Sequence, residues 1–417
     1  MHKPRLLAIA TMPPCPSTNG YSLRVYHLIE ELAKAWEITL VAPAPPESGV
    51  GDLLARVRDY VRVPPASRWP SMPSQFDPHP LRETVRRLMA DRSPAAVLAW
   101  HGAEFLACDR AFPPTVADRI DSLALQKWRD LVHPVGWRER ARTLRATWEF
   151  ARYERQVVRA LPFTVVVAED DAVALRRLSG RDTVRVVPNG VVTASLRDGI
   201  EEAHVPTVLF TGVLDYCPNM HAARYFAEEI WPAVRAAVPQ AEFVIAGRRP
   251  SASVRALAIL PGVQLMADVP DLRPVMRRAW VAVAPMLCGT GIKNKVLEAW
   301  AAAKPVVMTG RATSGLRLDG NAAGLVANDP RRIAGLVIQL LGDRERRGRL
   351  GAAGYRLVAR WHTWAGAADQ VSALLDAARG AMARRHAEVV HRAWRRPLKP
   401  VTIPRTLQPS SQDNANA

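Results

Sequence analysis

The chain has 417 residues, too many for one ordinary hydrophobic core, and its 48% hydrophobic content predicts a globular protein of two domains. No stretch approaches the roughly 20 apolar residues that a membrane-spanning helix needs, and the four cysteines lack CxxC or metal-ligand spacing, which indicates free thiols in a reducing cytoplasm. The formal charge of +18 indicates an anionic partner, namely nucleic acid, a membrane surface or phosphorylated substrates. A high-GC genome, which favours arginine, is the alternative source of part of this charge and implies no function.

The first half of the chain alternates apolar, β-rich runs with helical patterns, as parallel β-α-β units do. Its basic and then apolar start could be a weak signal peptide, but the short apolar run before Thr11 and Met12 fits a first strand better. A helix is expected at 21–35. Strands are expected at 5–11, 38–42, 95–100, 115–120, 163–168 and 184–187.

Residues 126–160 form a long helical pattern with large aromatic side chains among many arginines. Nine basic minus four acidic residues leaves a charge of +5 for this segment. Aromatic rings interleaved with cations fit a surface at the level of lipid headgroups. A helix pair packed on the sheet, with its arginines merely solvated, explains the same pattern and is the slightly stronger interpretation. The aromatic residues are Trp128, Trp137, Trp148 and Phe150.

The second half of the chain repeats the alternation of strands and helices. Strands are expected at 207–212, 242–246, 263–266, 280–284, 305–308 and 324–326, and helices at 219–237, 271–278, 293–303 and 331–341. The sequence therefore predicts an α/β fold with two tandem, doubly wound Rossmann-like domains that face a central cleft. Ligands of such sheets bind beyond the carboxyl ends of the strands, so the loops at those ends are the candidate site.

The N-terminal domain is expected at 1–190 and the C-terminal domain at 207–361, with a linker at 191–206. Helices at 362–383 are expected to pack back on the first domain. The tail, 384–417, is basic and then rich in Pro, Ser, Asn and Gln, which predicts disorder from about residue 397.

The strongest candidate loop follows the fourth strand of the second domain and opens the next helix. Gly289 and Gly291 leave the backbone open to a ligand, and the first helical turn offers free N–H groups and the positive end of the helix dipole. Lys293 and Lys295 in this turn would repel a bare helix N-terminus, so an anion such as a diphosphate is expected between them. Glu298, one turn after Lys295, could accept hydrogen bonds from sugar hydroxyls. A solvated loop with ordinary surface lysines is the alternative.

Three further loops hold corresponding positions. Gly20, after the first strand, permits close approach of a phosphate, and Arg24 is expected to face the same cleft one turn later. Gly212 takes the same place in the second domain, where Asn219 either binds the ligand or caps the next helix. Arg248, just past a strand, could stack on a base or bind phosphate, unless it is simply solvated.

Two strand ends of the first domain could touch the transferred group or its acceptor. His101 ends one strand, where a histidine is more often structural. Asp121 ends the next, and a carboxylate at the mouth of a cleft needs a partner. No catalytic triad order, HExxH, EF-hand or P-loop occurs, and the absence of GxGxxG leaves a nicotinamide-binding site without support.

Taken together, these motifs resemble the group 1, or family 4, nucleotide-sugar glycosyltransferases with the GT-B fold, most strongly over 207–315, and one bacterial branch found with exopolysaccharide export genes. The resemblance implies a retaining transfer from a nucleotide-diphosphate donor, with no metal and no other cofactor. It implies that Lys295 holds the diphosphate, Glu298 the ribose hydroxyls and the amides at Gly20 the distal phosphate. It also implies that the leaving phosphate itself helps to deprotonate the acceptor.

Two departures from the family pattern stand out. Thr290 occupies the position, eight residues before Glu298, where the family often has a glutamate. The usual Arg/Lys pair after the first strand of the second domain is absent. Lys293 and Arg248 are hypothesised to supply the missing charge, so Lys293→Ala should weaken donor binding as badly as Lys295→Ala.

The sequence thus predicts a hexosyl-type glycosyltransferase that uses Asp121, His101 and Glu298 in catalysis. Its expected partners are a nucleotide sugar, a lipid-linked or polysaccharide acceptor of exopolysaccharide or cell-envelope synthesis, and an anionic membrane surface. It is expected in the cytoplasm, peripheral to the inner face of the plasma membrane. The alternatives are a nucleotide-sugar epimerase on the same fold and, on charge alone, a non-enzymatic nucleic-acid-binding protein.

Overall fold

The computed structural model describes residues 2–15, 19–43, 51–64, 79–103, 112–131, 136–193, 202–323 and 325–395. The chain separates into two compact units, Met1–Arg379 and Gly380–Ala417, and both Rossmann-like domains lie in the first. The tail from 397, parts of the linker and residues 16–18 of the Gly20 loop lie outside the described residues. None of the helices that the structure describes is long and apolar enough to cross a membrane.

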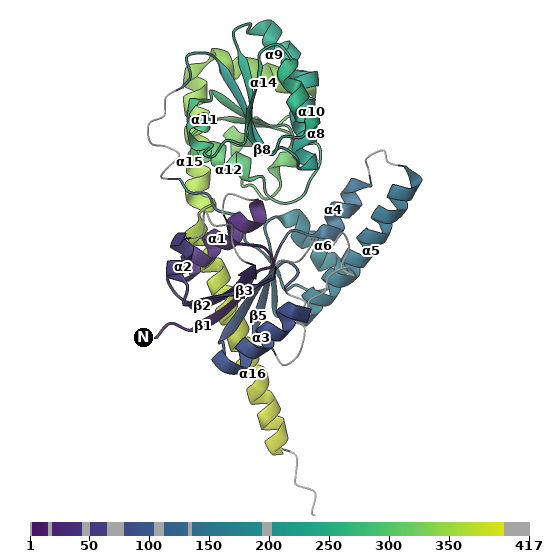
Figure 1. Ribbon diagram of the computed structural model, residues 1–417, viewed down its shortest axis with the longest axis vertical. Coiled ribbons are helices and arrows are strands. Elements are labelled where there is room, and N and C mark those ends of the chain that lie inside the picture. Colours follow the sequence, from purple (N-terminus) through teal and green to yellow (C-terminus); the bar gives the residue numbers. More distant parts are fainter. Residues whose placement is uncertain are drawn as a thin grey trace, which may run out of the picture. The chain divides into compact units, whose positions relative to one another are not determined.

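The N-terminal domain is built on one parallel sheet, to which the described residues contribute seven strands in the order β3-β2-β1-β4-β5-β6-β7 (Figure 1). Its strands are β1 (Arg5–Ile9), β2 (Glu37–Pro43), β3 (Asp59–Val63), β4 (Ala96–Trp100), β5 (Thr115–Ile120), β6 (Phe163–Val166) and β7 (Val184–Val186). Its helices are α1 (Gly20–Leu32), α2 (Gly51–Arg56), α3 (His79–Arg92), α4 (Leu123–Asp130), α5 (Trp137–Ala160) and α6 (Glu169–Ser179). Every strand expected in this half is confirmed, whereas β3 was not expected because its charged residues alternate with apolar ones on an exposed edge.

The two faces of this sheet are covered by different helices, because successive side chains of a strand point to opposite faces. Leu6 and Ala8 of β1 pack with α1 and with α16 (Trp364–Arg395). Leu7 and Ile9 pack against α3 on the other face. The strand order reverses direction between β1 and β4, so the chain loops after these two strands lie next to each other at the carboxyl edge of the sheet.

The C-terminal domain holds a second parallel sheet, with five described strands in the order β10-β9-β8-β11-β12. They are β8 (Thr207–Val213), β9 (Glu242–Arg248), β10 (Val263–Ala267), β11 (Val281–Ala284) and β12 (Val306–Met308). All five were expected. The sixth expected strand, 324–326, is not a strand in its described part: Val326 makes only an isolated bridge with Met308.

Most helices expected in the second domain are confirmed with shifted ends. The helix expected at 219–237 is instead three segments, in which a π-helical turn, η3, joins α8 to α9. Pro232 explains the break, since its ring has no N–H to donate and crowds the preceding turn. The helices are α8 (Cys217–Tyr225), η3 (Phe226–Ile230), α9 (Trp231–Ala237), α10 (Ala252–Arg255), η4 (Ala256–Ile259), α11 (Arg273–Arg278), α12 (Asn294–Ala301), η5 (Gly310–Thr313), α13 (Gly320–Ala323), α14 (Pro330–Gly342) and α15 (Arg344–Trp361).

The chain returns to the N-terminal domain after α15. Trp364, Val371 and Leu375 of α16 are buried in the same core as β1, β2 and α1. The indole nitrogen of Trp36 donates a hydrogen bond to the hydroxyl of Ser372 at 2.8 Å. The first part of α16 therefore belongs to the N-terminal domain.

Candidate active site

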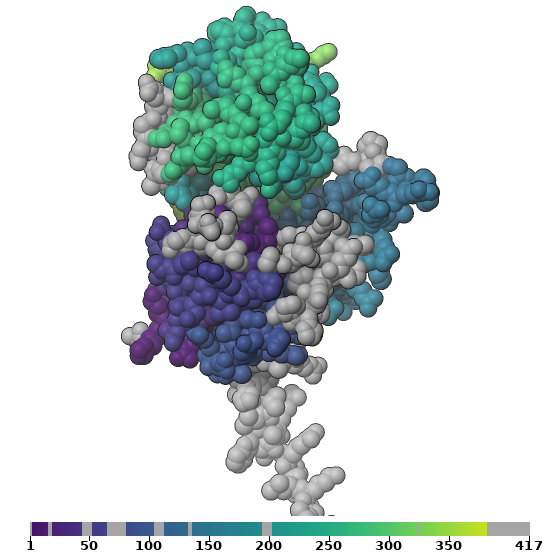
Figure 2. All heavy atoms as spheres, viewed as in Figure 1, coloured from purple at the N-terminus to yellow at the C-terminus, as the bar shows by residue number. Residues whose placement is uncertain are grey.

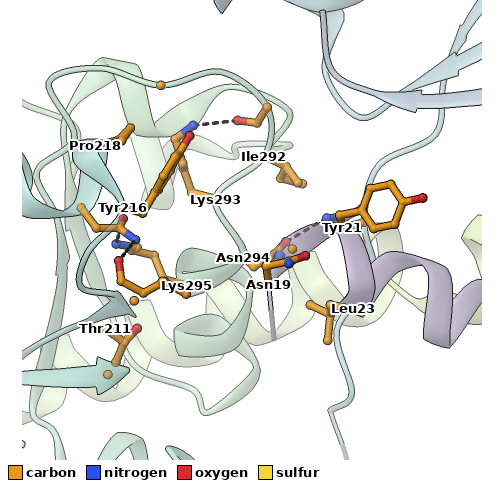
Figure 3. A pocket seen from close by; sticks show the side chains of 18 of the residues that line it. Asn19, Tyr21, Leu23, Thr211, Tyr216, Pro218, Ile292, Lys293, Asn294 and Lys295 are labelled. Carbon is orange, nitrogen blue, oxygen red and sulfur yellow. Dashed lines mark hydrogen bonds between the residues drawn. The ribbon is translucent and has the colours of Figure 1, made fainter. Parts of the chain in front are cut away.

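One cavity of about 700 Å³ lies at the carboxyl ends of both sheets (Figure 3). Loops after β1, β4 and β5 border it from the N-terminal domain, and loops after β8, β9 and β11 border it from the C-terminal domain. Ten of the eleven residues that the sequence singles out line this cavity. They are Gly20, His101, Asp121, Gly212, Asn219, Arg248, Gly291, Lys293, Lys295 and Glu298.

Lys295 projects from the first turn of α12 into the cavity. Its Nζ donates to Oδ1 of Asn219 at 2.8 Å and lies 3.8 Å from the centre of the Phe210 ring. Burial, and then the charge of Lys293, hold the pKa of Lys295 well below its usual range. A cation that is desolvated in this way gains from an anionic ligand, because the ligand replaces the water that the lysine has lost.

Lys293 is nearly buried and has two roles. Its Nζ donates to the carbonyl oxygens of Thr290 at 2.6 Å and Gly291 at 2.9 Å, and so fixes the loop before α12. Burial lowers the pKa of Lys293 to about 8, against the opposing effect of Asp121. The ammonium group has three N–H donors, so one remains after the two carbonyls are served.

Glu298 lies one helical turn beyond Lys295, on the wall of the same cavity. Burial raises the pKa of its carboxyl, and the charge of Lys295 opposes that shift. The two side chains therefore present a cation and a carboxylate side by side, a pair that suits a ligand with a phosphate next to hydroxyl groups.

Glycine is needed at several of the lining positions. Gly289 and Gly291 have φ angles of +95° and +65°, in the left-handed region that other residues avoid. A Cβ on Gly212 would lie 2.7 Å from Nδ2 of Asn219 and 3.3 Å from Nζ of Lys295. The missing side chain at Gly212 therefore leaves room for the lysine head.

The side chain of Asn219 makes two hydrogen bonds that join parts of the cavity wall. Its Nδ2 donates to the carbonyl oxygen of Val213 at 2.9 Å, while its Oδ1 accepts from Lys295. It lies inside α8, whose N-cap is Tyr216, so the capping role that the sequence left open is not the one observed. Asn219 instead ties the loop after β8 to the lysine of α12.

The N-terminal domain contributes a neutral histidine and a carboxylate. Nδ1 of His101 lies 2.8 Å from the carbonyl oxygen of Arg119, so this nitrogen carries the proton and donates. Burial and the charge of Arg119 lower the pKa of His101 to about 3, which keeps the ring uncharged at neutral pH. Oδ2 of Asp121 accepts a hydrogen bond from the Thr290 hydroxyl at 3.3 Å.

The protonation of Asp121 is unusual. Burial raises its pKa to about 6, with a further contribution from the charge of Glu154, while the bond from Thr290 and the charges of Arg119 and Lys293 oppose the rise. Asp171, buried behind it, has a pKa raised to about 7 by burial and by the charge of Asp121. Asp121 can therefore gain or lose a proton near neutral pH.

The expectation that Arg24 faces the cavity is wrong. Its side chain is fully buried beneath α1, where Nε donates to Oδ2 of Asp118 and Nη1 donates to Oδ1 of Asn189, both at 2.8 Å. A guanidinium with a carboxylate partner inside the fold gains nothing by turning outward. Sequence spacing placed Arg24 one turn after Gly20 but could not reveal that Asp118, far along the chain, meets it.

Two asparagines of the site were missed. Asn294 lies between the two lysines at the start of α12, and Asn189 lies in the turn after β7; both line the cavity. Nδ2 of Asn189 donates to Oδ1 of Asn294 at 2.9 Å. In the sequence, the expected strand at 184–187 ended just before Asn189, and nothing there assigned a role to the residues that follow.

Figure 3 shows how the two sides of the cavity meet. Lys293 and Lys295 lie with Thr211, Tyr216 and Pro218 of the C-terminal domain, whereas Asn19, Tyr21 and Leu23 come from the start of α1. Asn294 lies between these groups. A ligand in the cavity would therefore contact the N-termini of α1 and α12 together.

The family model described as glycosyl transferases group 1 matches residues 205–343, which contain every C-terminal residue discussed above. None of the curated proteins matches the sequence.

Three solved structures with a similar fold are distant from this chain in sequence. HepE of Anabaena, in complex with UDP and glucose, is 13% identical with a TM-score of 0.66, and the match covers 90% of this chain and 100% of HepE. A glycosyltransferase from Rickettsia africae is 11% identical with a TM-score of 0.64, covering 91% of this chain and 99% of that one. WaaG, a glycosyltransferase involved in lipopolysaccharide biosynthesis, is 11% identical with a TM-score of 0.60, covering 89% and 99%.

These matches show the fold and, over residues 205–343, a likeness to the group 1 glycosyltransferases, while the exopolysaccharide branch stays a prediction. The family match lies where the sequence motifs are densest, and the structural matches cover both domains. Residues 205–343 match the model of the group 1 glycosyltransferases, the family that the sequence motifs resemble, and the chain has the GT-B fold.

Proposed function

We propose that this protein transfers a hexosyl group from a nucleotide-diphosphate sugar to a hydroxyl of a glycan or lipid-linked acceptor, with retention of the anomeric configuration. One observation carries the proposal. Lys293, Lys295 and Glu298 line one cavity with the N-terminus of α1, so two cations, two helix N-termini and a carboxylate converge there. A diphosphate bound to a ribose matches that combination of charge and hydrogen-bonding groups.

In this proposal the bond between the sugar C1 and the diphosphate oxygen breaks while a bond from C1 to the acceptor oxygen forms on the same face. The acceptor proton passes to the leaving phosphate, and Lys295 with the α12 N-terminus stabilises the negative charge that develops on the diphosphate. Asp121 and His101 border the cavity from the opposite domain, where the sugar and the acceptor would lie. An uncharged His101 would orient a sugar hydroxyl rather than neutralise phosphate.

We also propose that the reaction needs no metal ion, because the two lysines offer positive charge where a metal would otherwise be required. Uridine diphosphate donors come first among candidates, since HepE, which has this fold, is seen with UDP-glucose. Activity should then persist in the presence of a chelator.

The test is a panel of nucleotide sugars offered with and without acceptor glycans, with products followed by mass spectrometry and NMR. The expected result is a glycoside with the anomeric configuration of the donor, formed only when acceptor is present. Conversion of the donor to a sugar epimer without acceptor would establish the epimerase instead. Inverted product would refute the retaining step.

We further propose that α5 brings the enzyme to an anionic membrane surface at the inner face of the plasma membrane, where a lipid-linked acceptor of envelope or exopolysaccharide synthesis would be found. Leu144 lies seven residues after Trp137 and four before Trp148, so the three side chains share one face of α5. Trp137 is 76% and Trp148 62% exposed. Arg152 and Arg155 continue the same face toward the C-terminal end of the helix.

Figure 2 shows this helix at the surface of the N-terminal domain. Exposed tryptophans beside arginines suit the headgroup layer of an anionic bilayer. Flotation with phosphatidylglycerol vesicles at low salt should carry the protein, whereas the double variant Trp137→Ser/Trp148→Ser should stay behind. Trp361→Ser, which changes a half-exposed tryptophan of the other domain, is the control. Equal flotation of the double variant and the control would refute the surface.

A further inference from the structure

Asn189 lies in the segment by which the chain leaves the N-terminal domain. It contacts the segment around His362, by which the chain returns to that domain. It is 3% exposed in the turn after β7. Its carbonyl oxygen accepts a hydrogen bond from Nδ1 of His362 at 3.2 Å, and the amide of Val191, two residues further on, donates to the carbonyl oxygen of His362 at 2.9 Å. A Cβ on Gly190 would lie 2.2 Å from the backbone nitrogen of Trp364. The outgoing and returning segments are therefore packed directly against each other at Asn189.

The orientation of the Asn189 side chain is set by its partners. Nη1 of Arg24 can only donate, so the atom that it contacts at 2.8 Å must be the amide oxygen of Asn189. Nδ2 of Asn189 then points the other way, to Oδ1 of Asn294 at 2.9 Å. Arg24 is itself held by Asp118. A buried chain of polar contacts thus leads from β5, through α1 and the crossing, to the first residue of α12.

The same series of hydrogen bonds sets the orientation of the Asn294 side-chain amide. Because its oxygen faces Asn189, its Nδ2 is turned to the Gly20 loop and would lie 3.4 Å from a Cβ on Gly20. Asn294 stands between Lys293 and Lys295, the two lysines of the cavity. Its N–H donors therefore join those of the α1 N-terminus on the side of the cavity where a phosphate would bind.

We propose that Asn189 is a positioning residue, which locks the first turn of α12 against the Gly20 loop through Asn294 and so holds the lysines of one domain in register with the helix N-terminus of the other. The proposal rests on the proposed function only where catalysis is measured. Its structural part, the coupling of α12 to the domain crossing, can be tested without any substrate.

The matched variants are Asn189→Asp, Asn294→Ala and the double variant. Asn189→Asp keeps an oxygen that accepts from Arg24, but it places a second oxygen opposite Oδ1 of Asn294. The Asn294 side chain must then move away or reverse its amide. Asn294→Ala removes the acceptor oxygen together with the Nδ2 donors that face the Gly20 loop. Asn321→Asp, on exposed α13, makes the same change of charge away from the cavity. The amide hydrogen exchange of 294–301, measured by mass spectrometry without ligand, reports the position of α12 directly.

Each single variant should speed exchange in 294–301 by about two- to tenfold, as expected for the loss of one buried hydrogen bond. The double variant should exchange no faster than the faster single variant, because both remove the same contact. UDP affinity, measured by calorimetry, should fall most in the variant whose exchange rises most. The decrease in kcat should be larger than the increase in KM. Asn321→Asp should exchange at 294–301 as the unmutated protein does.

Additive effects of the two substitutions, or unchanged exchange at α12 in either folded single variant, would overturn the proposal. If Asn189→Asp fails to fold, Asn294→Ala alone must raise exchange both at α12 and at 188–191. If the unmutated protein turns over no nucleotide sugar, the proposed function fails, while the exchange result still decides the role of Asn189.

Discussion

Replacing Lys295 by methionine removes the ammonium group from the cavity and leaves a side chain of similar length over the Phe210 ring. A hydrogen bond to a charged partner contributes about 1.5–3 kcal/mol, so the loss corresponds to a roughly 10- to 150-fold weaker nucleotide affinity. Burial moves the expectation to the lower end of that range. It depresses the pKa of Lys295, so part of the favourable interaction with a diphosphate goes into protonating the amine. We expect about a tenfold loss.

The assay is calorimetric titration of UDP into the unmutated protein and the variant at one pH and one ionic strength. Lys304→Met is the matched control, since Lys304 is also buried in the C-terminal domain, has its pKa lowered to about 8 by burial, and is not among the residues that border the cavity. A variant that binds UDP as well as the unmutated protein, or a control that loses as much affinity as Lys295→Met, would refute the assignment of Lys295 to the diphosphate.

Other predictions follow from the same geometry. Lys293→Ala should weaken UDP binding at least as much as Lys295→Ala in the same titration, because it removes a charge and also frees the two loop carbonyls. UDP affinity should fall as pH rises above about 8, because a bound anion raises the lowered pKa of Lys293 and the complex must then take up a proton. The fall should be at most about tenfold per pH unit for each proton taken up. A UDP affinity that stays constant from pH 7 to 10 would contradict this. Gly212→Ala should weaken UDP binding roughly tenfold by displacing Lys295, and about 1–3 kcal/mol of overpacking should lower the melting temperature by a few degrees as well. Arg24→Met should destabilise the fold by about 3–5 kcal/mol in urea denaturation by leaving Asp118 unpaired, and adding Asp118→Asn should restore part of the loss.

The part of the site that sequence could predict is the part built from local rules. A strand, a loop with glycines and a helix start place Gly291, Lys293 and Lys295 within a few residues, and helical spacing puts Glu298 on the same side as Lys295. The carboxyl ends of neighbouring parallel strands meet at one edge, so separate loops could be assigned to one cavity before any coordinates were known.

What sequence could not predict depends on partners that are distant along the chain. Whether Arg24 points to solvent or inward is decided by Asp118 and Asn189, and no periodicity shows that these residues converge. The same holds for the hydrogen bond between Asn189 and Asn294, which joins a turn of one domain to a helix of the other. The π-helical turn before Pro232 was missed for a local reason, because the apolar spacing continues smoothly through it.

The contacts of Thr290 explain why threonine suits the position where the resemblance predicts a glutamate. A glutamate there would bring a carboxylate into the loop before α12, yet the Thr290 hydroxyl already lies 3.3 Å from the carboxylate of Asp121. A side chain on Gly291 would also come within 3.6 Å of that oxygen. Two carboxylates at this distance would each raise the pKa of the other, and Asp121 already has its pKa raised to about 6. Threonine at 290 thus fits a site in which the N-terminal domain supplies the acid through Asp121, and its hydroxyl adds the hydrogen bond that favours the charged form of that acid.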